Sequence, residues 1–204
     1  MITPTTITNY NRTEAELEEF LMFAILVAGK GAEQQAKKLD AFLDTIMSMG
    51  MGAEDYTPFD GLGYSISIEE FFKDRHKQEI NLLDRQMKMH KLGQYNRVGH
   101  AFKEILKFKG KLKKVTIEEL ESVKGIGSKT ARFFVLHSRP DAKVAVLDTH
   151  ILKWLNEKGY KVPKATPAKK KYAEIEKLFL TEAINHQMTP ADLDLSIWKS
   201  YATK

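Results

Sequence analysis

Two short helical segments around a Gly-x-Gly turn are predicted by the stretch Leu120-Glu-Ser-Val-Lys-Gly125-Ile-Gly127-Ser-Lys129-Thr-Ala131. Glycine adopts positive φ without steric cost and lets a backbone approach a ligand closely. The turn leads into a helix N-terminus, where free amide groups and the helix dipole favour an anion. A DNA phosphate suits this place, and Lys124 and Lys129 add positive charge beside it. The spacing leaves one alternative open, which is a plain glycine turn between two helices.

Helical periodicity and helix-start signals continue on both sides of this stretch. Capping boxes are predicted at Thr13 with Glu16 and at Thr116 with Glu119. Asp148 stands where an N-cap belongs, ahead of an apolar helical stripe. Further apolar stripes at helical spacing lie within residues 17–25, 36–46, 82–89 and 95–106. The sequence contains no β-hairpin signal, and the fold class predicted is all-α.

Glycine, proline and short polar residues predict where helices break and restart. We expect a loop over Met49–Gly63, and a helix starting at Ser67. Ser128 is predicted to cap the helix after the glycine turn. Thr166-Pro167 and Thr189-Pro190 each predict an N-cap followed by proline at the first helical position.

The composition excludes several classes of protein. A length of 204 residues allows one domain or two interlocked halves, and 32 basic against 27 acidic residues give a net charge of +5. This excess favours a polyanionic partner. The absence of cysteine excludes disulfides, cysteine nucleophiles, cysteine-bound zinc and iron–sulfur clusters. No apolar run approaches the ~20 residues of a membrane-spanning helix, and no secretory signal pattern opens the chain, so we expect an intracellular protein without a membrane partner.

The glycine-turn stretch resembles the helix-hairpin-helix of DNA repair glycosylases, the HhH-GPD superfamily. The resemblance continues through Val144-Ala-Val-Leu-Asp148-Thr-His150, which is similar to the turn and catalytic aspartate that follow the hairpin there. Together the two matches cover Glu119–Leu152. Weaker similarity extends to residues 93–98, like the helix start before the hairpin, and to residues 192–198, like the C-terminal helix of 8-oxoguanine glycosylases. The chain departs from the family at Lys124, where proline is frequent, and it lacks the cysteine cluster of the endonuclease III branch.

The resemblance implies an architecture and a pair of catalytic residues. The architecture is a single glycosylase domain, residues 1–204, built of two α-helical subdomains with a DNA-binding cleft between them. One subdomain is expected to span about residues 32–132, and the other to combine residues 1–31 with residues 133–204. The implied catalytic residues are Lys129 and Asp148.

Asp148 matches the catalytic aspartate of the superfamily. Breaking the bond between sugar C1′ and a base passes through an oxocarbenium-like transition state, which a carboxylate stabilises. The same carboxylate is able to activate a water or relay protons. Seen without the resemblance, Asp148 is a plain helix cap.

Lys129 occupies the position of the nucleophilic lysine in the bifunctional members. A neutral amine attacks C1′, displaces the base and forms a Schiff base, after which the strand is cleaved by β-elimination. Seen without the resemblance, Lys129 is a solvated lysine or one that contacts a phosphate.

The resemblance also implies DNA contacts and a pocket for the extruded base. The expected DNA-binding residues are Lys124, Gly125, Ile126, Gly127, Ser128, Thr130 and His150. A flipped base needs stacking surfaces, for which Phe133 and Trp198 are candidates, although each aromatic side chain also suits the core. The histidines show no metal-ligand spacing, so no metal and no cofactor are expected.

These inferences converge on a monomeric, DNA-associated, bifunctional DNA glycosylase with abasic-site lyase activity, located in the cytoplasm or nucleoid. Its partner is double-stranded DNA that contains a damaged base, with 8-oxoguanine as the first expectation and an oxidised pyrimidine or other modified base as the alternative. Two further hypotheses stay open: a non-catalytic hairpin module that only grips phosphates, and a monofunctional glycosylase that uses Asp148 and water.

Overall fold

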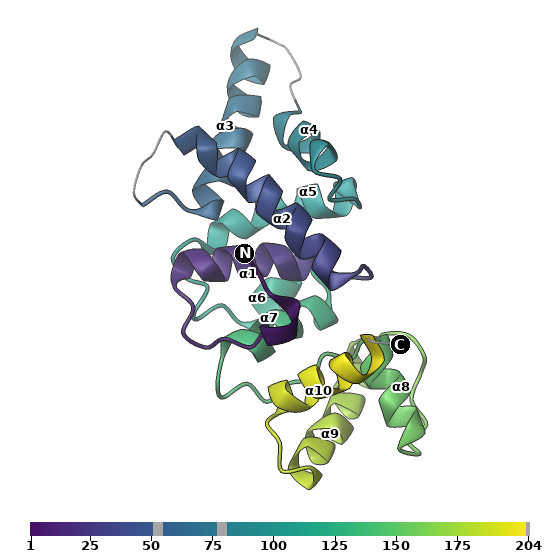
Figure 1. Ribbon diagram of the computed structural model, residues 1–204. Coiled ribbons are helices and arrows are strands. Elements are labelled where there is room, and N and C mark those ends of the chain that lie inside the picture. The colour runs from purple at the N-terminus through teal and green to yellow at the C-terminus, as the bar shows by residue number, and fades with distance from the viewer. Residues whose placement is uncertain (51–54, 77–80, 203–204) are drawn as a thin grey trace. The chain divides into compact units, whose positions relative to one another are not determined.

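The computed structural model describes residues 1–50, 55–76 and 81–202, and within them it contains ten α-helices and no β-strand (Figure 1). The helices are α1 (Glu14–Leu26), α2 (Ala32–Met47), α3 (Pro58–His76), α4 (Leu82–Met89), α5 (Tyr95–Ile105), α6 (Ile117–Glu121), α7 (Ser128–Ser138), α8 (Thr149–Glu157), α9 (Lys169–Asn185) and α10 (Pro190–Ala202). The predicted all-α fold class is confirmed. No helix in the described ranges is long and apolar enough to cross a membrane.

The chain divides into two compact units. The first comprises residues 1–4 and 12–126 and holds α1 to α6, whereas the second comprises residues 5–11 and 127–204 and holds α7 to α10. The grouping expected from sequence placed the N-terminal helix with the C-terminal ones. Here α1 belongs to the first unit, because it packs on α2, α3 and α5. The N-terminal segment Thr5–Asn11, by contrast, is part of the second unit.

The core of the first unit is built around α1. Phe20, Leu21, Ile25 and Leu26 are completely buried, and the helix is enclosed by its neighbours rather than amphipathic. Its predicted capping box is confirmed, since the Thr13 side chain accepts a hydrogen bond from the Glu16 amide and the Glu16 carboxylate accepts one from the Thr13 amide. The predicted box that starts α6 at Thr116 is confirmed as well.

One acidic side chain, that of Glu18, is buried within this apolar helix. Its Oε2 accepts a hydrogen bond from the amide of Phe59 at 2.9 Å, in the first turn of α3. Burial raises the pKa of Glu18, while this hydrogen bond lowers it. This hydrogen bond ties α1 to the start of α3, where helix amides lack partners within the helix.

The loop predicted over Met49–Gly63 is wrong from Pro58 onward, and residues 51–54 of it lie outside the described residues. The helix α3 begins at Pro58 and runs through the expected start at Ser67. A Cβ at Gly61 would lie 2.9 Å from the carbonyl oxygen of Ile46, so this glycine lets α3 approach α2 closely. Packing between helices therefore outweighs the helix-breaking tendency of glycine here.

The start of α3 has a cap that the sequence reading overlooked. The amide and hydroxyl of Thr57 donate to the carboxylate of Asp60 at 3.1 and 3.0 Å. The Asp60 amide in turn donates to the Thr57 hydroxyl at 3.4 Å. This reciprocal arrangement satisfies amide groups at the helix start.

The second unit is organised around Tyr172, which is completely buried on α9. Its hydroxyl accepts from the amide of Leu147 at 3.0 Å and donates to the carbonyl of Ala145 at 2.8 Å. The core around it includes Leu152, Phe179 and Ile197. Tyr172 therefore fixes the extended segment that leads directly into Asp148.

Two of the predicted helix starts in this unit are wrong by one or a few residues. The helix α9 begins at Lys169 rather than at Pro167, because the Thr166 hydroxyl donates to the carbonyl of Leu147 and so holds the segment instead of capping a helix. Gly127 is the N-cap of α7, and Ser128 is its first helical residue. The start at Pro190 is confirmed, where the Asp192 amide donates to the Thr189 hydroxyl at 3.1 Å.

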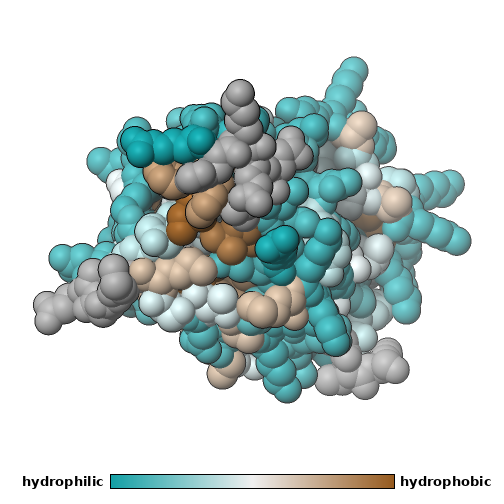
Figure 2. All heavy atoms as spheres, turned by 90° about the horizontal axis from the view of Figure 1, so that it is seen from above, coloured by the Kyte–Doolittle hydropathy of each residue, from teal (hydrophilic) through white to brown (hydrophobic). Residues whose placement is uncertain are grey.

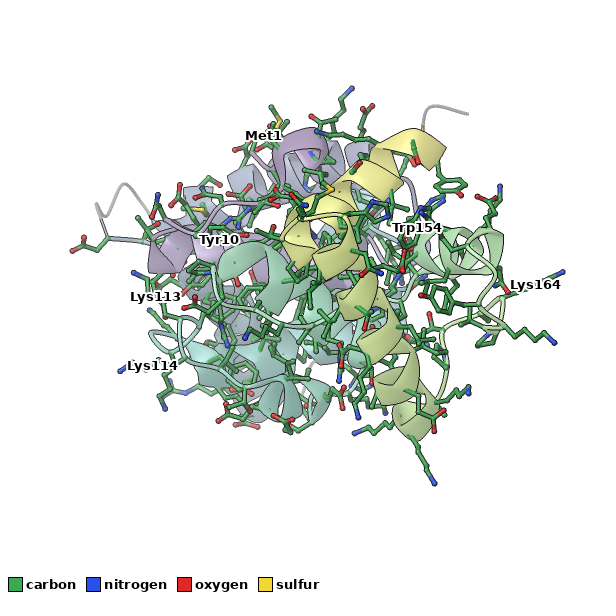
Figure 3. All side chains as sticks on the ribbon, turned by 90° about the horizontal axis from the view of Figure 1, so that it is seen from below. Met1, Tyr10, Lys113, Lys114, Trp154 and Lys164 are labelled. Carbon is green, nitrogen blue, oxygen red and sulfur yellow. The ribbon has the colours of Figure 1, made fainter. Side chains whose placement is uncertain are left out.

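One face of the molecule is largely polar (Figure 2). Most of the face in Figure 2 is hydrophilic, with a small hydrophobic patch, in keeping with a chain of which 29% is charged. In Figure 3, Lys113 and Lys114 project from the first unit, and Lys164 projects from the second.

Candidate active site

The two glycines of the predicted turn sit in different surroundings. Gly125 has a φ of +102°, and a Cβ there would lie 2.8 Å from the carbonyl oxygen of Arg97. The Arg97 guanidinium donates to the carbonyls of Gly125 at 2.9 Å and Ile25 at 2.8 Å. Gly127 has a φ of −100°, and a Cβ there would meet nothing within 4 Å. Gly125 is thus required by the fold, whereas Gly127 leaves its backbone open to approach.

The remaining predicted residues of the turn divide into exposed and packed positions. Lys124 is exposed, and its amide donates to Glu104 at 3.2 Å. Ile126 is buried, and its amide donates to the Val123 carbonyl at 3.0 Å. Thr130 is buried as well. Ser128 is half-buried at the first position of α7. The N-cap before it, Gly127, makes no side-chain hydrogen bond to the helix, and the first turn of α7 contains no acidic residue. The amides of this first turn are therefore suited to an anion.

Lys129 and Asp148 both belong to the second unit and both are half-buried. Lys129 is the second residue of α7. Asp148 is the N-cap of α8, where its Oδ1 accepts from the amides of His150 and Ile151, each at 2.9 Å. Among the described residues none donates a hydrogen bond to its Oδ2. One carboxylate oxygen thus caps the helix while the other remains available for chemistry.

A third ionisable group, Asp194 of α10, joins these two. Its carboxylate is buried, lies 3.2 Å from Nε2 of His137, and interacts electrostatically with both Asp148 and Lys129. Burial raises the pKa of Asp194, whereas the hydrogen bond and charge of His137 lower it. Asp194 was not singled out from the sequence. Its position one helical turn before Trp198 is a signal that places both residues on the same face of α10.

His150 is half-buried and stacks on Tyr201, with ring centroids 5.7 Å apart and an interplanar angle of 26°. The Tyr201 hydroxyl donates to Glu157, and this hydrogen bond raises the pKa of Tyr201 to about 12. The Lys153 ammonium lies 4.8 Å from the centre of the Tyr201 ring. The imidazole of His150 therefore stacks on the neutral phenol ring of Tyr201, which is hydrogen-bonded to Glu157 of α8.

The two candidate stacking residues are both partly exposed. Phe133 packs edge-on against His137, with ring centroids 5.0 Å apart, and borders a small cluster of Leu136, Val146 and Ala191. Trp198 lies half-buried on α10. Each side chain retains an accessible surface, as a stacking role requires.

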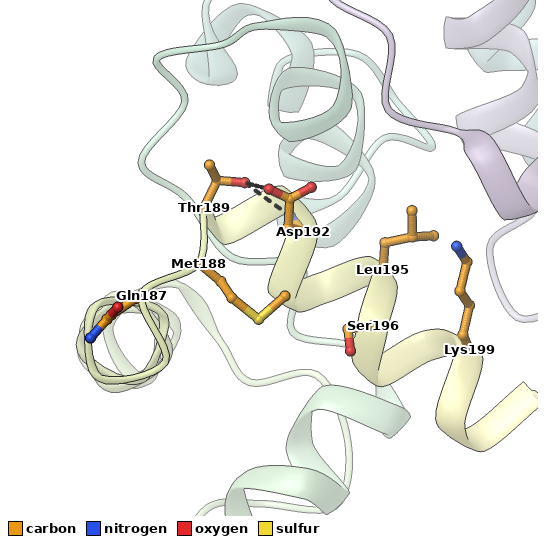
Figure 4. A pocket seen from close by; sticks show the side chains of 7 residues that line it. All are labelled: Gln187, Met188, Thr189, Asp192, Leu195, Ser196 and Lys199. Atoms are coloured by element: carbon orange, nitrogen blue, oxygen red, sulfur yellow. Dashed lines mark hydrogen bonds between the residues drawn. The ribbon is translucent and has the colours of Figure 1, made fainter.

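A hollow of about 550 Å³ lies on a different face of α10. It is lined by Gln187, Met188, Thr189, Asp192, Leu195, Ser196 and Lys199 (Figure 4). The α10 residues that line the hollow are spaced three or four positions apart, so they share one side of the helix. Asp194 and Trp198 are four positions apart and lie on another side of α10. The hollow is thus separate from the residues predicted to be catalytic. No group of three or more potential metal ligands occurs within the described ranges.

Comparison with known proteins supplies the family context of this site. Residues 64–188 match the family model described as 8-oxoguanine DNA glycosylase, of the Ogg helix-hairpin-helix type. An 8-oxoguanine DNA glycosylase/AP lyase from Methanocaldococcus jannaschii is 39% identical over 83 residues, a stretch that covers 39% of this chain and 38% of that protein.

Solved structures support the same fold. The M. jannaschii 8-oxoguanine glycosylase/lyase in complex with a 15mer DNA containing 8-oxoguanine is similar with a TM-score of 0.67 and 23% identity, covering 95% of this chain and 84% of that one. The 8-oxoguanine DNA glycosylase of Thermotoga maritima gives a TM-score of 0.65 and 21% identity, covering 94% and 82%.

Proposed function

Because the chain belongs to the 8-oxoguanine DNA glycosylase family of helix-hairpin-helix proteins, we propose that it is a bifunctional glycosylase and abasic-site lyase that excises 8-oxoguanine from duplex DNA. One observation carries this proposal. The same compact unit holds a half-buried lysine at the start of α7 and, at the start of α8, a half-buried carboxylate that uses only one oxygen to cap its helix.

In the proposed reaction the neutral amine of Lys129 attacks C1′ of the damaged nucleotide. The bond from C1′ to the base breaks, and the base leaves with the bonding electrons and takes up a proton. Ring opening and loss of a proton from nitrogen give the Schiff base, which makes a proton on C2′ acidic and permits β-elimination of the 3′ phosphate. Asp148 stabilises the positive charge that develops at the sugar.

The hairpin turn supplies the proposed grip on the DNA backbone. The open backbone at Gly127 and the first-turn amides of α7 are suited to one phosphate, and exposed Lys124 adds positive charge. His150 is proposed as a second phosphate contact, with its ring orientation set by Tyr201. The proposed partner is duplex DNA, bound by a monomer.

The extruded base is proposed to stack between aromatic surfaces offered by Phe133 and Trp198. Base flipping costs a few kcal/mol of lost stacking and pairing, which new aromatic contacts offset. Both side chains are partly exposed in the unit that holds Lys129 and Asp148.

Borohydride trapping tests the proposal. The protein is incubated with duplexes that carry 8-oxoguanine, thymine glycol, uracil or an abasic site, and a covalent protein–DNA band is sought after reduction. We expect a band from the 8-oxoguanine and abasic duplexes that disappears in Lys129→Gln.

Lys124→Gln is the matched control, since it removes a nearby lysine that has no nucleophilic role. This variant should bind more weakly but still form the band. If only the duplex with thymine glycol gave a band, the substrate would be an oxidised pyrimidine and not 8-oxoguanine. Binding without any band would overturn the lyase assignment. Release of free base would then indicate a monofunctional glycosylase, and no release would indicate a module that only binds DNA.

A further inference from the structure

A carboxylate of α9 joins the helix that carries Lys129 to the segment that leads into Asp148. Oε1 of Glu176 accepts a hydrogen bond from Nε of Arg132 at 2.8 Å and another from the amide of Ala145 at 2.9 Å. Arg132 lies on α7, three residues after Lys129. Ala145 lies three residues before Asp148. One oxygen atom of the second unit therefore connects the two parts of the candidate active site.

On the α7 side, Arg132 contacts both Glu176 and Tyr172. The side chains of Arg132 and Glu176 are only 16% and 14% exposed, and the guanidinium lies 4.5 Å from the centre of the Tyr172 ring. Nη1 of Arg132 also donates to the carbonyl of Ser128 at 3.3 Å, which is part of the peptide bond to Lys129. Charged groups that lose water need partners of this kind. The start of α7 is thus tied to α9.

On the Asp148 side, two hydroxyl groups hold the backbone before α8. The Tyr172 hydroxyl accepts from the amide of Leu147 at 3.0 Å and donates to the carbonyl of Ala145 at 2.8 Å. The Thr166 hydroxyl donates at 3.0 Å to the carbonyl of Leu147, which is part of the peptide bond to Asp148. Ala145 and Leu147 are completely buried and lie outside the helices. Side chains therefore supply the hydrogen bonds that a regular element would otherwise provide.

Tyr172 and Glu176 are four residues apart, so they share one face of α9. Together with Arg132 they form a group that we call the α9 clamp. A nucleophile and a stabilising carboxylate that act on the same sugar carbon must both be placed accurately, because a displacement of about 1 Å can lower a rate by about 10²-fold. The α9 clamp contacts the backbone on both sides of this requirement.

We propose that the α9 clamp fixes the position of Lys129 relative to Asp148. The inference rests on the proposed function, because it gives the clamp a part in the same reaction. Arg132, Tyr172 and Glu176 are positioning residues in this scheme, since they act through Lys129 and Asp148.

Single-turnover borohydride trapping of Glu176→Ala tests the inference. A saturating excess of protein is used, so that neither weaker binding nor a smaller folded fraction lowers the observed rate constant. We expect the rate constant on the 8-oxoguanine duplex to fall by about 10²-fold, because this reaction needs both Lys129 and Asp148 in place. The loss on an abasic-site duplex should be smaller, since no base has to leave.

Glu174→Ala is the matched control. Glu174 lies on the same helix but is exposed, and it pairs with the exposed Lys171 at 2.9 Å. This variant should keep the wild-type rate constant on both duplexes. Glu176→Gln should recover most of the rate lost in Glu176→Ala, because its amide oxygen accepts the same hydrogen bonds. A glutamine variant as slow as the alanine variant would overturn the clamp, since the charge of Glu176 alone would then account for the effect.

Tyr172→Phe gives a second variant that retains the ring and removes only the hydroxyl. It should lower the same rate constant on the 8-oxoguanine duplex. A wild-type rate constant in folded Glu176→Ala or Tyr172→Phe would overturn the inference while leaving the proposed function intact. Equal losses on the two duplexes would also overturn it, because only Lys129 would then have been displaced. Absence of any adduct from the wild-type protein would overturn both.

Hydrogen exchange of the wild-type protein provides a measurement that does not depend on any variant. The amides of Ala145 and Leu147 should exchange slowly, although they lie outside the helices, because each donates to a side chain of the α9 clamp. Rapid exchange at either amide would show that the clamp is open in solution and would overturn the inference.

Discussion

At Gly125 and Gly127 an added methyl group would meet opposite surroundings. We expect Gly125→Ala to lower the free energy of unfolding by about 1–3 kcal/mol, because it combines a positive φ with a Cβ 2.8 Å from the Arg97 carbonyl oxygen. Gly127→Ala should leave stability within about 0.5 kcal/mol of wild type, since its φ is ordinary and its surroundings are empty. Thermal unfolding measures both.

The same pair separates a structural from a ligand-related role. Gly127→Ala should weaken binding to an abasic-site duplex despite its normal stability, because the methyl group would obstruct close approach of a phosphate. Wild-type affinity in this variant would argue against a phosphate at Gly127.

Single residues also mark the limit of sequence reasoning about the site. Lys129 and Asp148 stand out because they belong to local motifs that can be read along the chain. Asp194 does not stand out, because its partner His137 lies 57 residues away along the chain. The other partner of His137, Thr8, lies 129 residues away from His137. No spacing rule connects such positions before the chain is folded.

Among the elements, α1 and α3 are joined by a buried carboxylate whose protonation depends on pH. Burial raises the pKa of Glu18 above its value in the unfolded chain, so its contribution to stability is fully present below the unfolded pKa and is lost as pH rises through the folded pKa. Glu18→Gln should therefore gain stability relative to wild type as pH rises from 4 to 7. Urea unfolding at a series of pH values measures this difference. A difference that stays constant with pH would contradict the account.

The helices themselves were predictable where the signal is local, as in the capping boxes at Thr13 and Thr116. The prediction failed for α3, because Gly61 is accommodated by close packing on Ile46 that only the folded unit contains. It failed at Thr166 for a related reason, since that hydroxyl is already used by the Leu147 carbonyl. Local signals thus fix helix ends unless a tertiary contact takes over the capping group.

For the molecule as a whole, the net charge of +5 predicts binding to DNA that weakens as salt increases. We expect Lys124→Gln to reduce the slope of log affinity against log salt by about one, because one phosphate contact is lost. Lys164→Gln should leave the slope unchanged, since Lys164 is exposed between α8 and α9 and lies outside the residues proposed to contact DNA. Fluorescence anisotropy with an undamaged duplex measures both slopes. Equal slopes for wild type and Lys124→Gln would remove that lysine from the interface.

The path of the N-terminal segment has a consequence for how the protein is made. Thr8 is among the first residues to emerge during synthesis, yet its partner His137 is 129 residues away and Asp194 is later still. The two side-chain hydrogen bonds of His137 can therefore be completed only after nearly the whole chain has been synthesised. A chain that ended before α10 would therefore bury His137 without the carboxylate that pairs with its Nε2, so this part of the second unit is completed late in synthesis.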